Sequence, residues 1–383
     1  TEMAKFLGPS YTTEYIISHC FPEIGNSKDR VSCEVLPLEN AKSFWSLIAR
    51  VTLKWTSEED RKKYPSSIFV KIPTITSNVR RADDEERSKQ TLIDFTANEE
   101  TFYRIMDNNW IPGFPFPHYY HGEEVGEIPG REGCLVLEDF SGRAASVDYV
   151  PGFTLPQIES LVDALASWHA FIFDHQELTN AINLFKIDDE IQDYLFSESQ
   201  KLEQMCPEWF DDRITLLEKL FSADHANGAI RSYNELGIPA VLVHMDMNTT
   251  NVLWRKETMG TSKPQILSII DFQQVHFGNL CEDLARILQI GTSAEMRRKH
   301  EKRFLDRYHQ KLEKIMGNGN PVSLDQVHSA YLRVFPFVAN FSLFAVVCYH
   351  SMYEEMEKDE GKRAEKQEEL LKRARGIIDD IYR

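Results

Sequence analysis

The sequence lacks an excess of positive charge. Its 43 Lys and Arg residues stand against 60 Asp and Glu residues, which gives a formal net charge of −17 over 383 residues. A surface that docks on nucleic acid or on anionic lipid needs clustered cations facing the phosphates. The charge balance therefore argues against a nucleic-acid partner and against an anionic membrane surface. It is compatible with a neutral or cationic small-molecule substrate.

Cysteine is sparse and has no pattern. The six cysteines are scattered between residues 20 and 348, without a C-x-x-C pair and without regular spacing. Neither a zinc site nor a disulfide framework is indicated, and we expect reduced, mostly buried thiols. The N-terminal residues show no basic segment followed by an apolar run, so no signal peptide is evident. We expect a soluble, cytoplasmic protein.

Repeats, low-complexity tracts and long linkers are also missing, whereas apolar residues are plentiful. A hydrophobic content of 42% suffices for a large core and excludes global disorder. The most apolar stretch, residues 334–349, is too short to span a bilayer comfortably, and we interpret it as a buried helix. Pro336 divides the surrounding region, so we expect one helix at 324–333 and another at 336–357.

Residues 241–273 combine apolar runs with a few polar side chains. PAVLV, NVLW and QILSII are typical of short buried strands, and the polar residues lie in the connecting loop or at a strand end. Carboxylates and a carboxamide in such surroundings are costly to bury without a partner. Mg²⁺ takes such oxygen ligands and completes its shell with phosphates and water. We therefore predict a metal site made by Asn251 and Asp271, with Asp246 left to accept a proton.

The motifs in this stretch resemble those of kinases. H-M-D-M-N-T-T-N places four residues between Asp246 and Asn251, the spacing of a kinase catalytic loop, and I-I-D-F-Q follows on a later strand. The set most closely resembles the ecdysteroid kinase-like (CHK kinase-like) family, which is related to aminoglycoside phosphotransferases and choline kinases. A protein kinase is least favoured, because D-F-Q replaces D-F-G and no A-P-E follows. Within G-N-L-C-E-D-L-A, the resemblance implies that Asp283 supports the catalytic loop.

The resemblance covers nearly the whole chain and implies an α+β, protein kinase-like fold with two lobes. Residues 1–137 would form a smaller antiparallel β lobe with one main helix, which binds the nucleotide. Residues 138–383 would form a larger, mostly helical lobe for catalysis and substrate binding. The runs SCEVLPL, SFWSLIARVTLKW and SSIFVKIP are typical of the strands that the smaller lobe requires.

Several residues of the smaller lobe acquire roles from the resemblance. Lys71 would bind the ATP phosphates and pair with a glutamate of the next helix, expected after the charged stretch 80–89. The family pattern E-x-x-F-Y selects Glu99 over its neighbour at position 100. The turn at residues 39–46, which would cover the phosphates, contains no glycine, and only Ser46 matches the family there. A solvated lysine on an ordinary strand is the alternative interpretation.

The strand GCLVL and the following E-D-F-S-G resemble a kinase hinge. The Glu138 carbonyl and the Phe140 N–H would then contact adenine, although an ordinary strand and turn fit the same residues. T-L-P-Q at residues 154–157 is typical of a capping box that opens a helix. His169 falls within that helix, and we expect it to be structural, packed beneath the catalytic loop.

The implied activity is that of a phosphotransferase with an alcohol group as acceptor. With Mg²⁺ and ATP, Asp246 would accept the hydroxyl proton of a sterol-like or xenobiotic small molecule. One alternative is a choline- or ethanolamine-type kinase, which the acidic charge and the many aromatic residues favour. Another is a catalytically poor protein that binds a nucleotide or ligand, which the glycine-free turn favours. No protein partner is evident.

Overall fold

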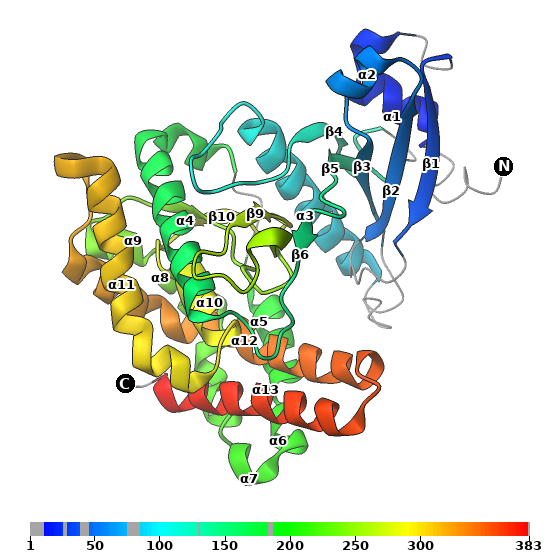
Figure 1. Cartoon of the computed structure of the whole chain (residues 1–383). Coiled ribbons are helices and arrows are strands. Elements are labelled where there is room, and N and C mark those ends of the chain that lie inside the picture. Colours follow the sequence, from blue (N-terminus) through cyan, green and yellow to red (C-terminus); the bar gives the residue numbers. More distant parts are fainter. Residues whose placement is uncertain are drawn as a thin grey trace. The chain divides into compact units, whose positions relative to one another are not determined.

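The computed structural model describes residues 11–25, 29–38, 46–74, 85–128, 131–182 and 187–381. Its tertiary contacts divide the chain into two units (Figure 1). Unit 1 comprises Thr1–Trp110 and Phe116–Arg143, and unit 2 comprises Ile111–Pro115 and Ala144–Arg383. The contacts thus divide after Arg143, whereas the sequence interpretation drew the lobe boundary after residue 137.

Unit 1 is built on a five-stranded antiparallel sheet in the order β1-β2-β3-β5-β4. Its strands are β1 (Val31–Pro37), β2 (Ser46–Trp55), β3 (Ser67–Pro73), β4 (Tyr119–Glu123) and β5 (Cys134–Glu138). Along β2, Ala49, Val51 and Leu53 are buried at alternate positions, which is the pattern of a strand with one face on a core. The three strands expected from the sequence are confirmed.

The α-helices of unit 1 are α1 (Thr13–Cys20), α2 (Glu58–Lys63) and α3 (Glu85–Met106). Both α1 and α3 pack against β4. Thr12 caps α1 by accepting a hydrogen bond from the Tyr15 N–H. The longest of these three helices, α3, begins inside the charged stretch 80–89 that we had expected to precede it.

Unit 2 contains two small sheets and most of the helices. β6 (Ala144–Ala145), β8 (Val252–Arg255) and β9 (Ile266–Ile269) form one sheet, and β7 (Val241–Val243) pairs with β10 (His276–Gly278). The α-helices are α4 (Leu155–Asp174), α5 (Asp189–Ser199), α6 (Lys201–Met205), α7 (Pro207–Phe210), α8 (Ala223–Ile230), α9 (Ser232–Leu236), α10 (Glu282–Ile290), α11 (Ala294–Met316), α12 (Leu324–Met356) and α13 (Glu360–Asp380). Short 3₁₀ segments lie at Pro22–Ile24, Gln176–Asn180, Thr215–Leu220, Lys256–Thr258 and Gly317–Gly319.

Helix α12 is continuous, so the expected interruption at Pro336 was wrong. Proline lacks the N–H that would bond the carbonyl four residues earlier. That residue, Leu332, is 62% exposed, and water can donate to the carbonyl in place of the missing amide. Within the described ranges, α12 alone is long and apolar enough to cross a membrane, and 72% of its apolar stretch is buried inside the protein. It serves as the central core helix of unit 2.

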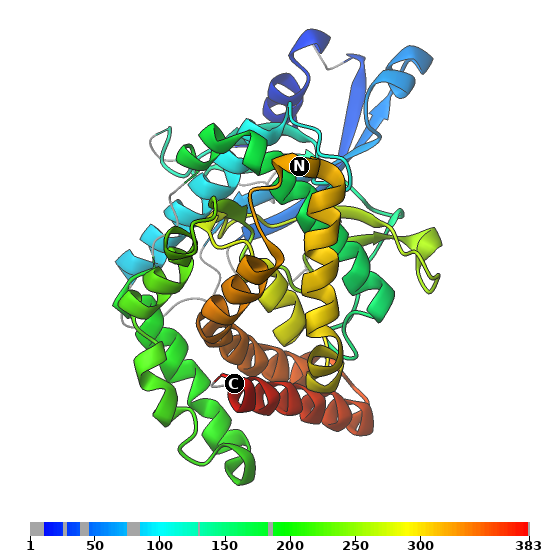
Figure 2. The ribbon, with the colours of Figure 1, turned by 90° about the vertical axis from the view of Figure 1, so that its left-hand side faces the viewer.

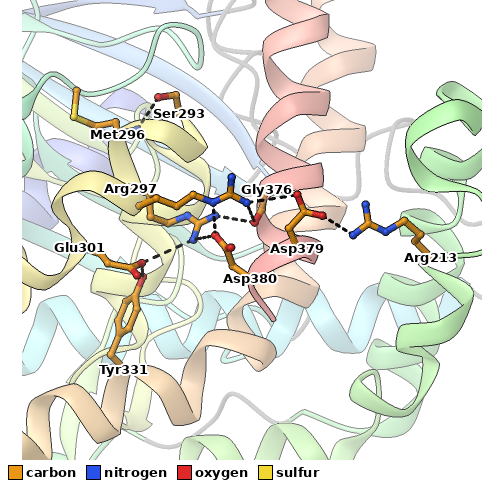
Figure 3. A network of polar contacts seen from close by, with 10 residues as sticks. Arg213, Ser293, Met296, Arg297, Glu301, Tyr331, Gly376, Asp379 and Asp380 are labelled. Atoms are coloured by element: carbon orange, nitrogen blue, oxygen red, sulfur yellow. Dashed lines mark hydrogen bonds and ion pairs between the residues drawn. The ribbon is translucent and has the colours of Figure 1, made fainter. Parts of the chain in front are cut away.

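The C-terminal helix α13 runs alongside α12 (Figures 1 and 2) and is bonded to α11 through buried charges. Figure 3 shows Arg297 of α11 reaching Asp380 at 2.7 Å and the Gly376 carbonyl at 3.0 Å. A Cβ atom on Gly376 would lie 2.3 Å from the Cβ of Ala294. The two helices therefore meet closely at a position where any side chain would force them apart.

All six cysteines are free thiols. Only Cys134 and Cys281 are buried, and the other four are partly exposed. The expectation of mostly buried thiols is therefore wrong for the majority.

Candidate active site

The loop after β7 is supported by Asp283, which lies in the first turn of α10. Its Oδ2 atom accepts the His244 N–H at 2.9 Å, and its Oδ1 atom accepts the Met245 N–H at 2.8 Å. Met245 has a φ of +70°, a left-handed conformation that residues other than glycine rarely adopt. Burial raises the pKa of Asp283 to about 6, although the two N–H groups act against it. The predicted support of the loop by Asp283 is confirmed.

His244 connects the same loop to the end of β9. Its Nδ1 atom accepts the Asp246 N–H at 3.2 Å, and its Nε2 atom lies 2.9 Å from the Ile270 carbonyl oxygen. A backbone amide can only donate and a carbonyl can only accept, so the ring is neutral with its proton on Nε2. The fully buried imidazole thereby fixes the backbone on either side of the candidate site.

Asp246 and Asn251 face each other across the loop. The Asn251 Nδ2 donates to the Asp246 carbonyl at 3.0 Å and to its Oδ2 at 3.2 Å. In this orientation the Asn251 Oδ1 accepts no hydrogen bond from the described residues. The Asp246 side chain is 28% exposed. The loop therefore offers one amide oxygen as a ligand and one solvent-accessible carboxylate.

Asp271 lies two residues after the end of β9. The Ile270 N–H donates to the Asn251 carbonyl at 3.0 Å, which extends the pairing of β8 with β9 by one residue. Asp271 itself has a φ of +70°, a conformation that aspartate tolerates better than most residues. The next side chain, Phe272, is fully buried, and its ring centroid lies 4.5 Å from that of His244 and 6.0 Å from that of Trp168.

These residues fit a magnesium ion in the chemistry of their donor atoms. Asn251 supplies an amide oxygen and Asp271 a carboxylate, the ligand types that Mg²⁺ prefers. Among the described residues, no group of three or more His, Cys, Asp and Glu side chains could hold a metal ion. An ion at Asn251 and Asp271 would therefore complete its shell with water and phosphate oxygens, as Mg²⁺ commonly does.

Arg286 joins the site, although the sequence interpretation missed it. Its Nη2 donates to the Asp246 Oδ1 at 3.0 Å, and its side chain is only 6% exposed. One signal was available, because Arg286 follows Asp283 by three residues and so lies on the same face of a helix. The sequence contained no sign that this face meets Asp246 as well as the loop backbone.

In unit 1, Lys71 of β3 pairs with Glu99 of α3. The Lys71 Nζ lies 2.7 Å from the Glu99 Oε2, and both side chains are at most 10% exposed. Glu100 instead accepts from the Tyr119 hydroxyl at 2.8 Å and pairs with Arg104. The predicted choice of Glu99 over Glu100 as the partner of Lys71 is confirmed, and the binding of a nucleotide by this pair stays a prediction.

The predicted hinge follows β5, which ends at Glu138. The Phe140 N–H donates to no acceptor within the described part of the chain. Asp139 accepts from the Ser141 N–H at 3.1 Å and from the Ser67 hydroxyl at 2.7 Å. Burial alone would raise the pKa of Asp139, but these hydrogen bonds outweigh burial and lower it. The turn that carries Phe140 is therefore rigidly organised.

Ser46 is the first residue of β2 and is 4% exposed. Its hydroxyl has no hydrogen-bond partner among the described residues. The rest of the predicted phosphate turn, residues 39–45, lies outside the described residues.

His169 is fully buried, as expected of a structural residue. Its hydrogen bond, however, is to the Tyr308 hydroxyl of α11, with a separation of 2.7 Å. The neighbouring Trp168 is the residue of α4 that packs on Phe272. Trp168 is therefore the residue of this pair that contacts the D-F-Q segment, whereas His169 bonds to α11.

Comparison with known proteins places the chain in a family. The family model DUF1679, described as "Uncharacterized oxidoreductase dhs-27", matches residues 32–383. The chain belongs to the DUF1679 family. A similar protein is the "Uncharacterized kinase-like protein D1044.1" of Caenorhabditis elegans, which is 32% identical over 377 residues that span 96% of this chain and 97% of that protein. The "Uncharacterized oxidoreductase dhs-27" of the same organism is 27% identical over 78% of this chain, but the match spans only 38% of that protein.

Solved structures show the fold of this DUF1679 chain. The GDP complex of a mutant aminoglycoside 2'-phosphotransferase-IIIa matches with a TM-score of 0.50 and 12% identity, over 96% of this chain and 97% of that chain. Choline kinase LicA from Streptococcus pneumoniae matches with a TM-score of 0.44 and 15% identity, over 96% and 99%. Together with the antiparallel sheet of unit 1 and the helical unit 2, the first match confirms the predicted kinase-like α+β fold.

Proposed function

We propose that this DUF1679 protein is a small-molecule kinase that transfers the γ-phosphoryl group of ATP to a hydroxyl group. The observation that carries the proposal is the arrangement around Asp246. Asn251 gives its amide N–H atoms to Asp246, and its backbone pairs with Ile270, the residue before Asp271, so the Asn251 amide oxygen and the Asp271 carboxylate can serve as two oxygen donors. Asp246 keeps a partly exposed carboxylate for the acceptor. Kinase catalytic loops divide the same tasks among the same residue types.

Each residue has a defined task in this proposal. Asp246 accepts the acceptor proton or orients the acceptor oxygen. Lys71, held by Glu99, anchors the nucleotide phosphates, and the backbone of Glu138 and Phe140 contacts adenine. Asn251 and Asp271 hold Mg²⁺, which supplies positive charge against the phosphate oxygens when bound. Ser46 contributes a hydroxyl to the phosphates.

The proposed acceptor is a sterol-like or xenobiotic alcohol. An amine-bearing acceptor such as choline gains most from unpaired carboxylates, and the charge of Asp246 is already paired with Arg286 at 3.0 Å. The kinase-like name of the 32% identical relative supports the reaction type, whereas the oxidoreductase name belongs to a protein of which the match covers only 38%. A cytoplasmic location without a protein partner remains part of the proposal.

Nucleotide binding tests the proposal first. Thermal melting would be followed with ATP alone, Mg²⁺ alone and both together, for the wild-type protein, Asp271→Ala and the matched control Asp325→Ala, whose side chain is exposed. We expect a shift that requires both ligands, is weakened in Asp271→Ala and is unchanged in Asp325→Ala. Absence of any shift at millimolar MgATP would contradict an active kinase.

A second experiment separates an enzyme from a protein that only binds nucleotide. Release of ADP would be measured with a panel of sterols, amino alcohols and xenobiotic phenols. Asp246→Asn should keep its MgATP affinity and lose transfer by about 10²-fold or more, because only the group that handles the acceptor proton is changed. Equal ADP release from Asp246→Asn and wild type, with every acceptor, would favour a binding protein.

A further inference from the structure

Arg286 makes an unusual set of contacts for a buried arginine. Its Nη2 donates to the Asp246 Oδ1 at 3.0 Å, and its Nη1 donates to the Ser342 hydroxyl at 3.2 Å. Its Nε has no hydrogen-bond partner among the described residues. Ser342 lies in α12 and is fully buried. The guanidinium thus links the core helix of unit 2 to the carboxylate of the candidate site.

Two other buried arginines of unit 2 show what a structural role looks like in this chain. Arg373 donates at 2.7 Å to each of three backbone carbonyls, those of Tyr149, Ile290 and Pro151. Arg297 donates to the Gly376 carbonyl and pairs with an aspartate that is itself buried (Figure 3). These arginines hold helices and loops together through the backbone or through buried charge.

Arg286 differs from both in what it holds. Among the described residues it donates to no backbone carbonyl, whereas Arg373 and Arg297 both do. All three arginines pair with a partly exposed carboxylate, but the partners of Arg373 and Arg297 are glutamates one turn along the same helix, and the partner of Arg286 is Asp246 of the candidate site. Two side chains therefore fix the Asp246 carboxylate, Arg286 at Oδ1 and Asn251 at Oδ2. Oδ2 retains a lone-pair position for an acceptor hydroxyl. Bonding at both oxygens restrains rotation of the carboxylate, and small misplacements of a reacting group are costly in rate.

We infer that Arg286 is a positioning residue of the phosphoryl-transfer site, acting through Asp246 and held in turn by Ser342. The inference rests on the proposed kinase function. The positive charge of Arg286 also compensates the negative charge that Asp246 would direct at an approaching phosphoryl group. Helix α10 consequently supports the loop through two residues: Asp283 accepts hydrogen bonds from the loop backbone, and Arg286 donates one to the Asp246 carboxylate.

A double-mutant cycle tests this inference. Arg286→Gln, Asp246→Asn and the double variant would be compared for MgATP affinity by calorimetry and for ADP release from MgATP with water as acceptor. We expect Arg286→Gln to lower kcat about 10-fold to 100-fold with little change in the KM for MgATP. In the Asp246→Asn background the same change should have almost no further effect, because Arg286 acts through that carboxylate. Arg286→Lys should recover part of the rate.

Controls distinguish positioning from folding. Arg333→Gln removes a 59% exposed arginine of α12 and should leave the kinetics unchanged. Should Arg286→Gln fail to fold, Ser342→Ala carries the test, with an expected few-fold fall in kcat at constant KM for MgATP. Equal losses from Arg286→Gln in both backgrounds, or a loss confined to MgATP affinity, would overturn the inference while the kinase function stood. Wild-type protein that neither binds MgATP nor releases ADP would overturn the proposed function, and the inference with it.

Discussion

Acid should destabilise unit 2 through His169. The imidazole is fully buried in α4, with Nδ1 2.7 Å from the Tyr308 hydroxyl oxygen, and its Nε2 has no hydrogen-bond partner in the described part of the chain. A protonated ring would carry a buried positive charge and an N–H at Nε2 without an acceptor. Burial accordingly lowers the pKa of His169 from 6.5 to about 3.

The shift sets the size and the sign of the effect. Between pH 6.5 and about pH 3 the unfolded chain binds a proton at His169 that the folded protein does not bind. The free energy of unfolding therefore falls by about 1.4 kcal/mol for each pH unit of acidification in this window. The contribution is fully present above the unfolded pKa and is lost progressively below it. Between pH 7 and pH 5 the expected loss is about 2 kcal/mol.

Urea unfolding followed by tryptophan fluorescence would measure this loss in wild type and in His169→Gln. Glutamine can still bond to Tyr308 but cannot take up a proton. The wild-type protein should lose about 2 kcal/mol more than the variant between pH 7 and pH 5. Other titrating groups contribute equally to both proteins and cancel in the comparison. Parallel losses in the two proteins would refute the reasoning.

Three further predictions concern other buried charges. Lys71→Met should destabilise unit 1 by about 3 kcal/mol, because it removes the cation that lies 2.7 Å from the buried Glu99 carboxylate. Adding Glu99→Gln should recover part of the loss in urea unfolding, and additive losses would contradict this. Arg373→Met should lower the free energy of unfolding by about 3 kcal/mol or more, because three backbone carbonyls lose their donor. Lys372→Met, at a 54% exposed side chain, should change it by no more than about 0.5 kcal/mol. Equal melting temperatures of the two variants would count against this prediction. Burial alone would lower the pKa of His276, but the buried Glu282 carboxylate 3.0 Å away outweighs burial and raises that pKa. The free energy of unfolding should therefore fall as the pH rises from 6.5 through the raised pKa. His276→Gln should flatten the pH profile of the unfolding free energy between pH 6 and pH 9.

Local sequence was sufficient for the strands and the catalytic loop. The short apolar runs that became β7, β8 and β9 are bounded by turn residues, and the spacing from Asp246 to Asn251 fixes which side chains share the loop. The choice of Glu99 as the partner of Lys71 could also be made, because the family pattern E-x-x-F-Y selects it over Glu100. In each case a known periodicity or motif spacing determines which residues meet.

Contacts between distant segments could not be predicted in the same way. Pro336 suggested two helices, because a local rule says that proline interrupts the hydrogen-bond ladder. The structure retains one helix, since burial of α12 outweighs the loss of one bond at a position next to solvent. We expected His169 to pack beneath the catalytic loop, but its hydrogen bond is to Tyr308 of α11, and it is the neighbouring Trp168 that packs on Phe272.

The surroundings of helix α10 explain why the contact of Arg286 with Asp246 could not be predicted from the sequence. Every residue from Glu282 to Ile290 is buried, so the helix has no solvated face on which a charged residue could be placed without consequence. A motif identifies Asp283 because its partners are backbone atoms, which every sequence provides. Arg286 needs two particular side chains, 40 residues upstream at Asp246 and 56 residues downstream at Ser342. Such a contact depends on how α10 packs between the loop and α12, and a linear pattern does not encode that packing. Positioning residues of this kind therefore emerge only from the folded structure, even where the reacting residues can be recognised from the sequence.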